Sequence, residues 1–342
     1  MQNSGPGKLN PRTWDEMLEE FRALGGVADN IRMGEGALGR GLFAVDPARP
    51  ARLHVPENLL IGLTDVAFES GALRVVSQAG VGARERAFFE NYQAHLSWGA
   101  GGRVEIEGIF AQAQSLPADL RHELTVKHRC GTWFDEASQS AFEQQFLQSR
   151  HIEYQGRMVL MPVMDLVNHG PGPAFRLKDG IGIDGTWPGE ITVRYADTDA
   201  YGAFQAWGFT CEEPVAFSIE LLGNIGQTRL HIERQLGETK SGPRQWVPRY
   251  AQREGDGVLN FLMLGNRQYP RICKGIFYKT MQNAGLDGYE EAFDTIQHVN
   301  RMHFLSLLEA LENVDGAMAQ TLRRMARYQL QALSFGFGVR ML

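Results

Sequence analysis

Side chains that could bind a ligand gather in two stretches near the middle of the chain. The first, SRHIEYQGRMVLMPVMDLVNH, runs from Ser149 to His169, and its apolar run from Val159 to Val167 ends in the polar pair Asn168-His169. The second, GEITVRY, ends in Tyr195. We expect both to form buried strands that end in polar groups, which need hydrogen-bond partners once they leave water.

The second stretch alternates between apolar and polar residues. This alternation places Ile191, Val193 and Tyr195 on one face of the strand, with Thr192 and Arg194 on the other. Tyr195 should therefore point inward, where its hydroxyl needs a partner.

A third stretch, GEGALG from Gly34 to Gly39, has the spacing GxGxxG of dinucleotide-binding sites. That motif needs a helix after its last glycine, so that the pyrophosphate meets a helix N-terminus. Here RGLFAV follows, from Arg40 to Val45, and this sequence is typical of a strand. An oxidoreductase that binds a nicotinamide cofactor is therefore a remote interpretation, although glycines do let the backbone approach a ligand closely.

Together the three stretches resemble the core of a SET-domain methyltransferase. GALGRGLFAV, the run from SR to PVMDLVNH, and GEITVRY followed by WGF occur in the family's order, and the branch they most resemble is the Rubisco large-subunit lysine methyltransferase type. The resemblance implies an α+β fold with a β-rich, β-clip-like and threaded SET core. A helical insertion would split this core, and a mainly helical C-terminal domain would follow it.

The resemblance also implies roles for individual residues. S-adenosyl-L-methionine would be the cofactor and a protein lysine side chain the methyl acceptor. Arg150 would bind the cofactor carboxylate, for which a guanidinium group is well suited. Tyr195 would be the catalytic residue, aligning the acceptor with the methyl group. The complete set of implied site residues comprises Gly39, Arg40, Gly41, Arg150, Asn168, His169 and Tyr195 for the cofactor, and Trp207 and Phe209 for the substrate.

Two residues depart from the family pattern and keep other functions open. Ala196 follows the tyrosine where SET proteins usually have glycine, and Trp207 stands where the related branch often has tyrosine. One alternative is therefore a SET-fold protein without catalytic activity, which would act as a binding protein or as a scaffold. Among enzymes, a histidine or a small molecule is the alternative methyl acceptor.

The resemblance, together with hydrophobic periodicity and breaker residues, divides the chain into five parts. Trp14, Met17, Leu18 and Phe21 recur at helical spacing and predict a helix that Thr13 caps and Gly25-Gly26 ends. A strand is expected over residues 158–167, and a hairpin turn at Asp179-Gly180. The five parts are a leader (disordered over residues 1–12) and N-terminal helix at 1–29, SET core at 30–75, helical insertion at 76–148, SET core at 149–213, and the C-terminal domain at 214–342.

Composition limits the class of protein and its partners. The chain has 342 residues, of which 43% are hydrophobic and 22% charged, as in ordinary globular proteins. Its net charge of −6 provides no basic field for nucleic acid.

The three cysteines lie far apart, without a CxxC or HExxH motif, so we expect no metal site. No apolar run is long enough to span a membrane, and we expect a cytoplasmic protein without a membrane partner.

Overall fold

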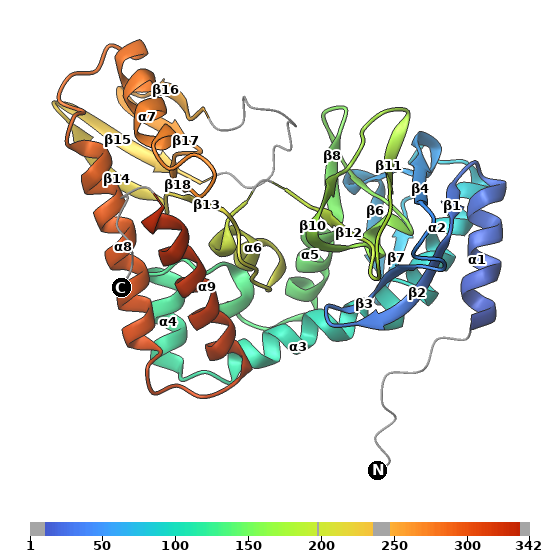
Figure 1. The fold of residues 1–342 in the computed structure, drawn as a ribbon. Helices are drawn as coiled ribbons and strands as arrows, with labels where there is room; N and C mark the ends of the chain where they lie inside the picture. Colours follow the sequence, from blue (N-terminus) through green and yellow to red (C-terminus); the bar gives the residue numbers. More distant parts are fainter. Residues whose placement is uncertain (1–10, 197, 235–246, 336–342) are drawn as a thin grey trace. The chain divides into compact units, whose positions relative to one another are not determined.

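The computed structural model describes residues 11–196, 198–234 and 247–335 (Figure 1). The chain forms two compact units, one of residues 1–108 and 138–196, the other of residues 109–137 and 197–342. Most of the predicted leader lies outside the described residues. Helix α1 spans Pro11–Ala23, so the predicted cap is wrong and Thr13 lies inside the helix. The fixed φ of proline suits the first helical turn, which explains the earlier start.

Two three-stranded sheets of the first unit join strands from both predicted parts of the SET core. β4 (Ala51–Pro56) lies between β1 (Val27–Asp29) and β11 (Gly180–Gly185), and pairs antiparallel with both. β9 (Arg157–Leu160) likewise lies between β5 (Ile61–Gly62) and β8 (His151–Tyr154). The two parts therefore share one core, as the resemblance implied.

Two hairpins and one parallel pair complete the strands of this unit. The hairpins are β2 (Ile31–Gly36) with β3 (Gly39–Ala44), and β6 (Val66–Glu69) with β7 (Ala72–Val75). The parallel pair is β10 (Asn168–Ala174) with β12 (Thr192–Arg194). The predicted turn at Asp179-Gly180 is confirmed, since both residues have positive φ and Arg176 pairs with Gly182 across it.

The predicted helical insertion is confirmed. Its α-helices are α2 (Ala83–His95), α3 (Arg103–Gln114), α4 (Ala118–Val126) and α5 (Gln139–Arg150). Ser138 caps α5, because its hydroxyl accepts a hydrogen bond from the Ala141 amide at 3.2 Å.

The prediction of a single strand over residues 158–167 is wrong. This apolar run forms a strand followed by a turn. β9 ends at Leu160, and the 3₁₀ turn Met164–Leu166 follows. Pro162 cannot donate a backbone hydrogen bond, and Val163 has a φ of +69°, which a β-branched side chain rarely adopts. Asn168 and His169 therefore begin the next strand, β10, instead of ending the run.

Besides α4, the second unit carries helices of the predicted C-terminal domain, one helix from the predicted SET core at residues 200–207, and several strands. The helices are α6 (Ala200–Trp207), α7 (Ile272–Asn283), α8 (Ala292–Ala310) and α9 (Ala317–Ser334). The strands are β13 (Val215–Phe217) paired with β18 (Met263–Asn266), and a sheet in the order β14 (Leu221–Ile225), β15 (Thr228–Glu233), β17 (Asp256–Asn260), β16 (Arg249–Arg253). The α+β class is thus confirmed. None of the described helices is long and apolar enough to cross a lipid bilayer.

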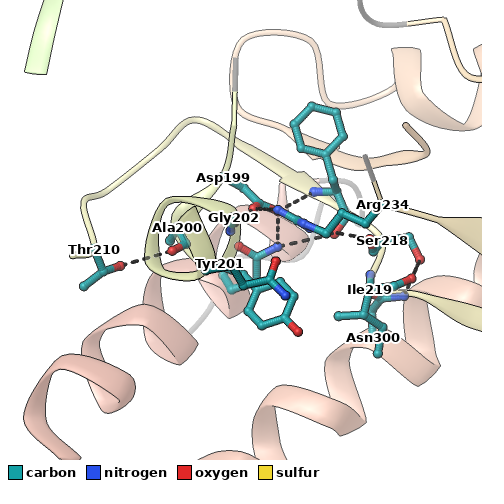
Figure 2. Close-up of polar contacts among 12 residues, drawn as sticks. Asp199, Ala200, Tyr201, Gly202, Thr210, Ser218, Ile219, Arg234 and Asn300 are labelled. Carbon is teal, nitrogen blue, oxygen red and sulfur yellow. Dashed lines mark hydrogen bonds and ion pairs between the residues drawn. The ribbon is translucent and has the colours of Figure 1, made fainter. Parts of the chain in front are cut away.

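A buried carboxylate, Asp199, joins the elements of the second unit (Figure 2). Its Oδ1 caps α6 by accepting from the Gly202 amide at 2.8 Å, and its Oδ2 accepts from the Phe217 amide at 2.7 Å and from Gln329 Nε2 at 2.6 Å. Arg234 forms an ion pair with the same carboxylate and lies over the Tyr201 ring. One charge pair thus holds α6, β13 and α9 together.

Asp199→Asn should lower the free energy of unfolding by roughly 3–5 kcal/mol, because the buried Arg234 would lose its counter-charge. Urea unfolding measures the change. As a matched control, Asp256→Asn removes a carboxylate that pairs with the half-exposed His231 at 2.8 Å, and should cost below about 1 kcal/mol. Equal small losses in the two variants would contradict the structural role of Asp199.

Candidate functional site

The glycine-rich stretch forms the tip of a hairpin. Gly36 and Gly39 face each other in register, with Ala37 and Leu38 between them. Gly39 has a φ of +88°, which favours glycine, and no atom lies within 4 Å of the position that a Cβ would take. Because strand β3 and not a helix follows, the structure contradicts the dinucleotide-binding interpretation.

Asn168 and Glu190 pack against the second strand of this hairpin. Asn168 donates from Nδ2 to the Arg40 carbonyl at 3.0 Å and to Glu190 Oε1 at 2.6 Å. A Cβ at Gly41 would lie 2.6 Å from Glu190 Oε1 and 2.7 Å from Asn168 Nδ2. A side chain at position 41 would therefore force Glu190 and Asn168 to move and would disturb the hydrogen bond between them.

The parallel strands β10 and β12 bring His169 beside Tyr195. His169 Nδ1 accepts a hydrogen bond from the Tyr195 amide at 3.2 Å, and the two rings meet edge to face, with centroids 5.3 Å apart. The strands lie so close that a Cβ at Gly172 would be 2.0 Å from the Thr192 carbonyl oxygen.

The hydroxyl of Tyr195 has the buried partner that its strand position predicted. It donates to the Val167 carbonyl at 2.6 Å, and the ring stacks on Phe175. Burial raises the pKa of Tyr195 well above its ordinary value, although Arg150 opposes the shift. The phenol therefore stays protonated at neutral pH, a state that suits alignment of a reactant and not general-base catalysis.

Arg150 and Arg40 converge on the carboxylate of Glu105. Arg150 donates to Glu105 Oε2 and to the Asp165 carbonyl, both at 3.2 Å, while Arg40 Nη2 lies 3.8 Å from Glu105 Oε1. Burial disfavours the charge of Arg150, but Asp165 and Glu105 outweigh this effect and raise its pKa. Arginine side chains stay protonated in proteins, so both guanidinium groups carry a positive charge.

The sequence reasoning missed Asp165 as a contributor to this region. Its carboxylate accepts hydrogen bonds from the Tyr92 hydroxyl and, at 2.7 Å, from the Ser97 hydroxyl. The pKa of Asp165 is raised, because the effect of burial exceeds the opposing effect of the nearby Arg150 charge. A lone acid inside the apolar run MPVMDLV was the available signal, because a buried charge needs partners.

Glu105 and Glu190 were also missed, and no local pattern marks either one. Their carboxylates contact residues far away in the sequence, which only the fold brings near.

Trp207 and Phe209 lie in the second compact unit, where their rings stack with centroids 5.8 Å apart. Their substrate-binding role stays a prediction.

Comparisons with known proteins found likeness at the level of structure. No protein-family model matches the chain. No curated protein matches it either. A structure of Rubisco LSMT bound to AdoMet is 14% identical, with a TM-score of 0.45, over 96% of this chain and 91% of that one. The SET domain of LSMT bound to lysine and AdoHcy is 13% identical, with a TM-score of 0.41, over 94% and 89%.

A third structure, of Rubisco LSMT bound to sinefungin and monomethyllysine, is 14% identical, with a TM-score of 0.41, over 95% of this chain and 89% of that one. The chain is thus structurally similar over nearly its whole length to Rubisco LSMT SET-domain structures, at low sequence identity. This likeness by itself assigns no activity.

Gly41→Ala should destabilise the first unit by about 1–3 kcal/mol, because the added methyl would collide with Glu190 and Asn168. In a Glu190→Ala background the same substitution should cost less, and a double-mutant cycle by urea unfolding measures the difference. Gly108→Ala, inside α3 with nothing within 4 Å of the added Cβ, is the matched control and should not destabilise. Strict additivity of the substitutions at positions 41 and 190 would contradict the contact.

Proposed function

We propose that this protein is an S-adenosylmethionine-dependent N-methyltransferase, with a protein lysine side chain as the favoured acceptor. One observation carries the proposal. The residues expected to bind the cofactor come from positions 39 to 195, yet contacts within the first unit join them into one connected set. Tyr195 contacts His169, whose neighbour Asn168 bonds to Arg40, and Arg40 and Arg150 share Glu105.

The chemistry of this set fits the cofactor. S-adenosylmethionine carries a carboxylate, and Arg150 and Arg40 supply two cationic guanidinium groups. Arg150 Nε is buried and has no hydrogen-bond partner among the described residues. A buried donor without a partner is costly, so a ligand that accepts from it is favoured. The open space at Gly39 lets a ligand reach the hairpin backbone.

When bound, the cofactor would supply an electrophilic methyl group on a sulfonium. The residues of the chain would then act mainly by positioning, which can lower a barrier by several kcal/mol. The Val167 carbonyl fixes the Tyr195 hydroxyl, and His169 fixes its backbone amide. Tyr195 is therefore held rigidly enough to orient an acceptor nitrogen.

A second candidate, favoured by Ala196 and Trp207, is a SET-fold protein that binds the cofactor without transferring its methyl group. Transfer of a labelled methyl group from S-adenosylmethionine to protein extract, free L-lysine or free L-histidine separates the candidates. Label on lysine residues of proteins in the extract supports the favoured acceptor, whereas label on histidine, or on a free amino acid only, supports the alternative enzymes. Binding without any labelled product supports the scaffold.

Calorimetric titration with S-adenosylmethionine tests the cofactor directly. We expect saturable binding that Arg150→Ala weakens by about 1.5–3 kcal/mol, the usual worth of a hydrogen bond to a charged group. Asn168→Ala should weaken it as well, because the hairpin backbone loses its contact. Arg52→Ala is the matched control, since this arginine is 61% exposed and should leave binding unchanged.

A folded wild-type protein that binds no S-adenosylmethionine would contradict the proposal. Equal affinities for wild type and Arg150→Ala would place the cofactor elsewhere.

A further inference from the structure

Glu105 lies in the first turn of α3, where it faces both buried arginines. Its Oε2 accepts from Arg150 Nη2 at 3.2 Å, and its Oε1 lies 3.8 Å from Arg40 Nη2. The side chains of Arg40 and Arg150 are only 6% and 19% exposed, whereas that of Glu105 is 50% exposed. A half-exposed carboxylate thus pairs with two largely buried cations.

Contacts other than Glu105 also hold the two arginines in place. Arg40 donates from Nη1 to the Ala100 carbonyl at 3.0 Å, and Arg150 donates from Nη1 to the Asp165 carbonyl. The Arg150 guanidinium also lies 5.5 Å from the centroid of the Phe146 ring. Each arginine thus has at least one contact that does not involve Glu105.

We propose that Glu105 occupies, from within the chain, the place that the carboxylate of S-adenosylmethionine takes on Arg150 and Arg40, and that the cofactor must displace it. The inference rests on the proposed function. It gives Glu105 the role of an internal competitor that lowers cofactor affinity. It also makes the Arg40 side chain a second carboxylate-binding group, in addition to its backbone.

The geometry explains how a cofactor carboxylate could displace Glu105 from Arg150. Glu105 uses Nη2 of Arg150, while Nε of the same group has no partner among the described residues. A carboxylate that accepts from Nε and Nη2 together makes a bidentate pair, which is stronger than a single contact. Glu105 is the 50% exposed member of the pair, so water can solvate its carboxylate once the cofactor carboxylate has taken its place on the arginines.

Glu105 adds a second acidic group beside the two arginines, in addition to the buried Asp165. A compound that lacks a carboxylate has no means of displacing Glu105. The pair of arginines would thus select for the amino-acid end of the cofactor, and the strength of the Glu105 contact would set the affinity.

The test is calorimetric titration of the full chain with S-adenosylmethionine and with decarboxylated S-adenosylmethionine. Glu105→Gln and Glu105→Ala should both bind S-adenosylmethionine more tightly, by about 3-fold to 10-fold, since the competing charge is gone. Neither should change the affinity for the decarboxylated compound. The matched control is Glu107→Gln, which removes an equal charge from the same helix but pairs with Arg103 instead. It should change neither affinity.

Weaker binding of S-adenosylmethionine by both Glu105 variants would overturn the inference and make Glu105 a residue that positions Arg150. An equal change for both compounds, or the same change in Glu107→Gln, would overturn it as well. Because wild type must first bind S-adenosylmethionine, failure of the proposed function is visible separately, as absence of binding by the wild type, and the inference would then fall with it.

Discussion

The first unit depends on the close approach of two backbone segments, β10 and β12. A side chain at Gly172 would collide with the Thr192 carbonyl, and one at Gly170 would lie 2.8 Å from the Thr192 side chain. Only glycine permits this spacing. The parallel pairing that results places His169 next to Tyr195 and turns Asn168 toward the hairpin of β2 and β3. Loss of this approach would separate the groups on which the proposed chemistry depends.

Buried charge is the second determinant of the site. Arg40 and Arg150 are too deeply buried to be solvated as free surface cations, so they are satisfied by backbone carbonyls and by Glu105. Stability alone does not explain this arrangement, because a buried ion pair often contributes no more to the free energy of folding than apolar side chains of similar volume. It is well suited to a site that exchanges an internal anion for a ligand's carboxylate.

The sequence predicted the local features of this site better than the contacts between them. The glycine hairpin, the inward face of Tyr195 and the helical insertion follow from turn chemistry and periodicity. The break at Pro162 and Val163 was missed, because a buried turn and a buried strand have equally apolar sequences. Glu105 and Glu190 could not be found, since their partners lie 45 and 22 positions away. The assigned roles of Tyr195, Trp207 and Phe209 and the threading of the core stay predictions.

Amide hydrogen exchange with and without S-adenosylmethionine tests most directly whether the three distant segments bind one cofactor. Slower exchange should appear together in peptides covering residues 36–45, 146–152 and 166–172, because a shared ligand orders all three. Helix α7 in the second unit, which carries none of the predicted site residues, should exchange at an unchanged rate. Protection that is absent from the three segments, or that falls on only one of them, would contradict a shared cofactor site.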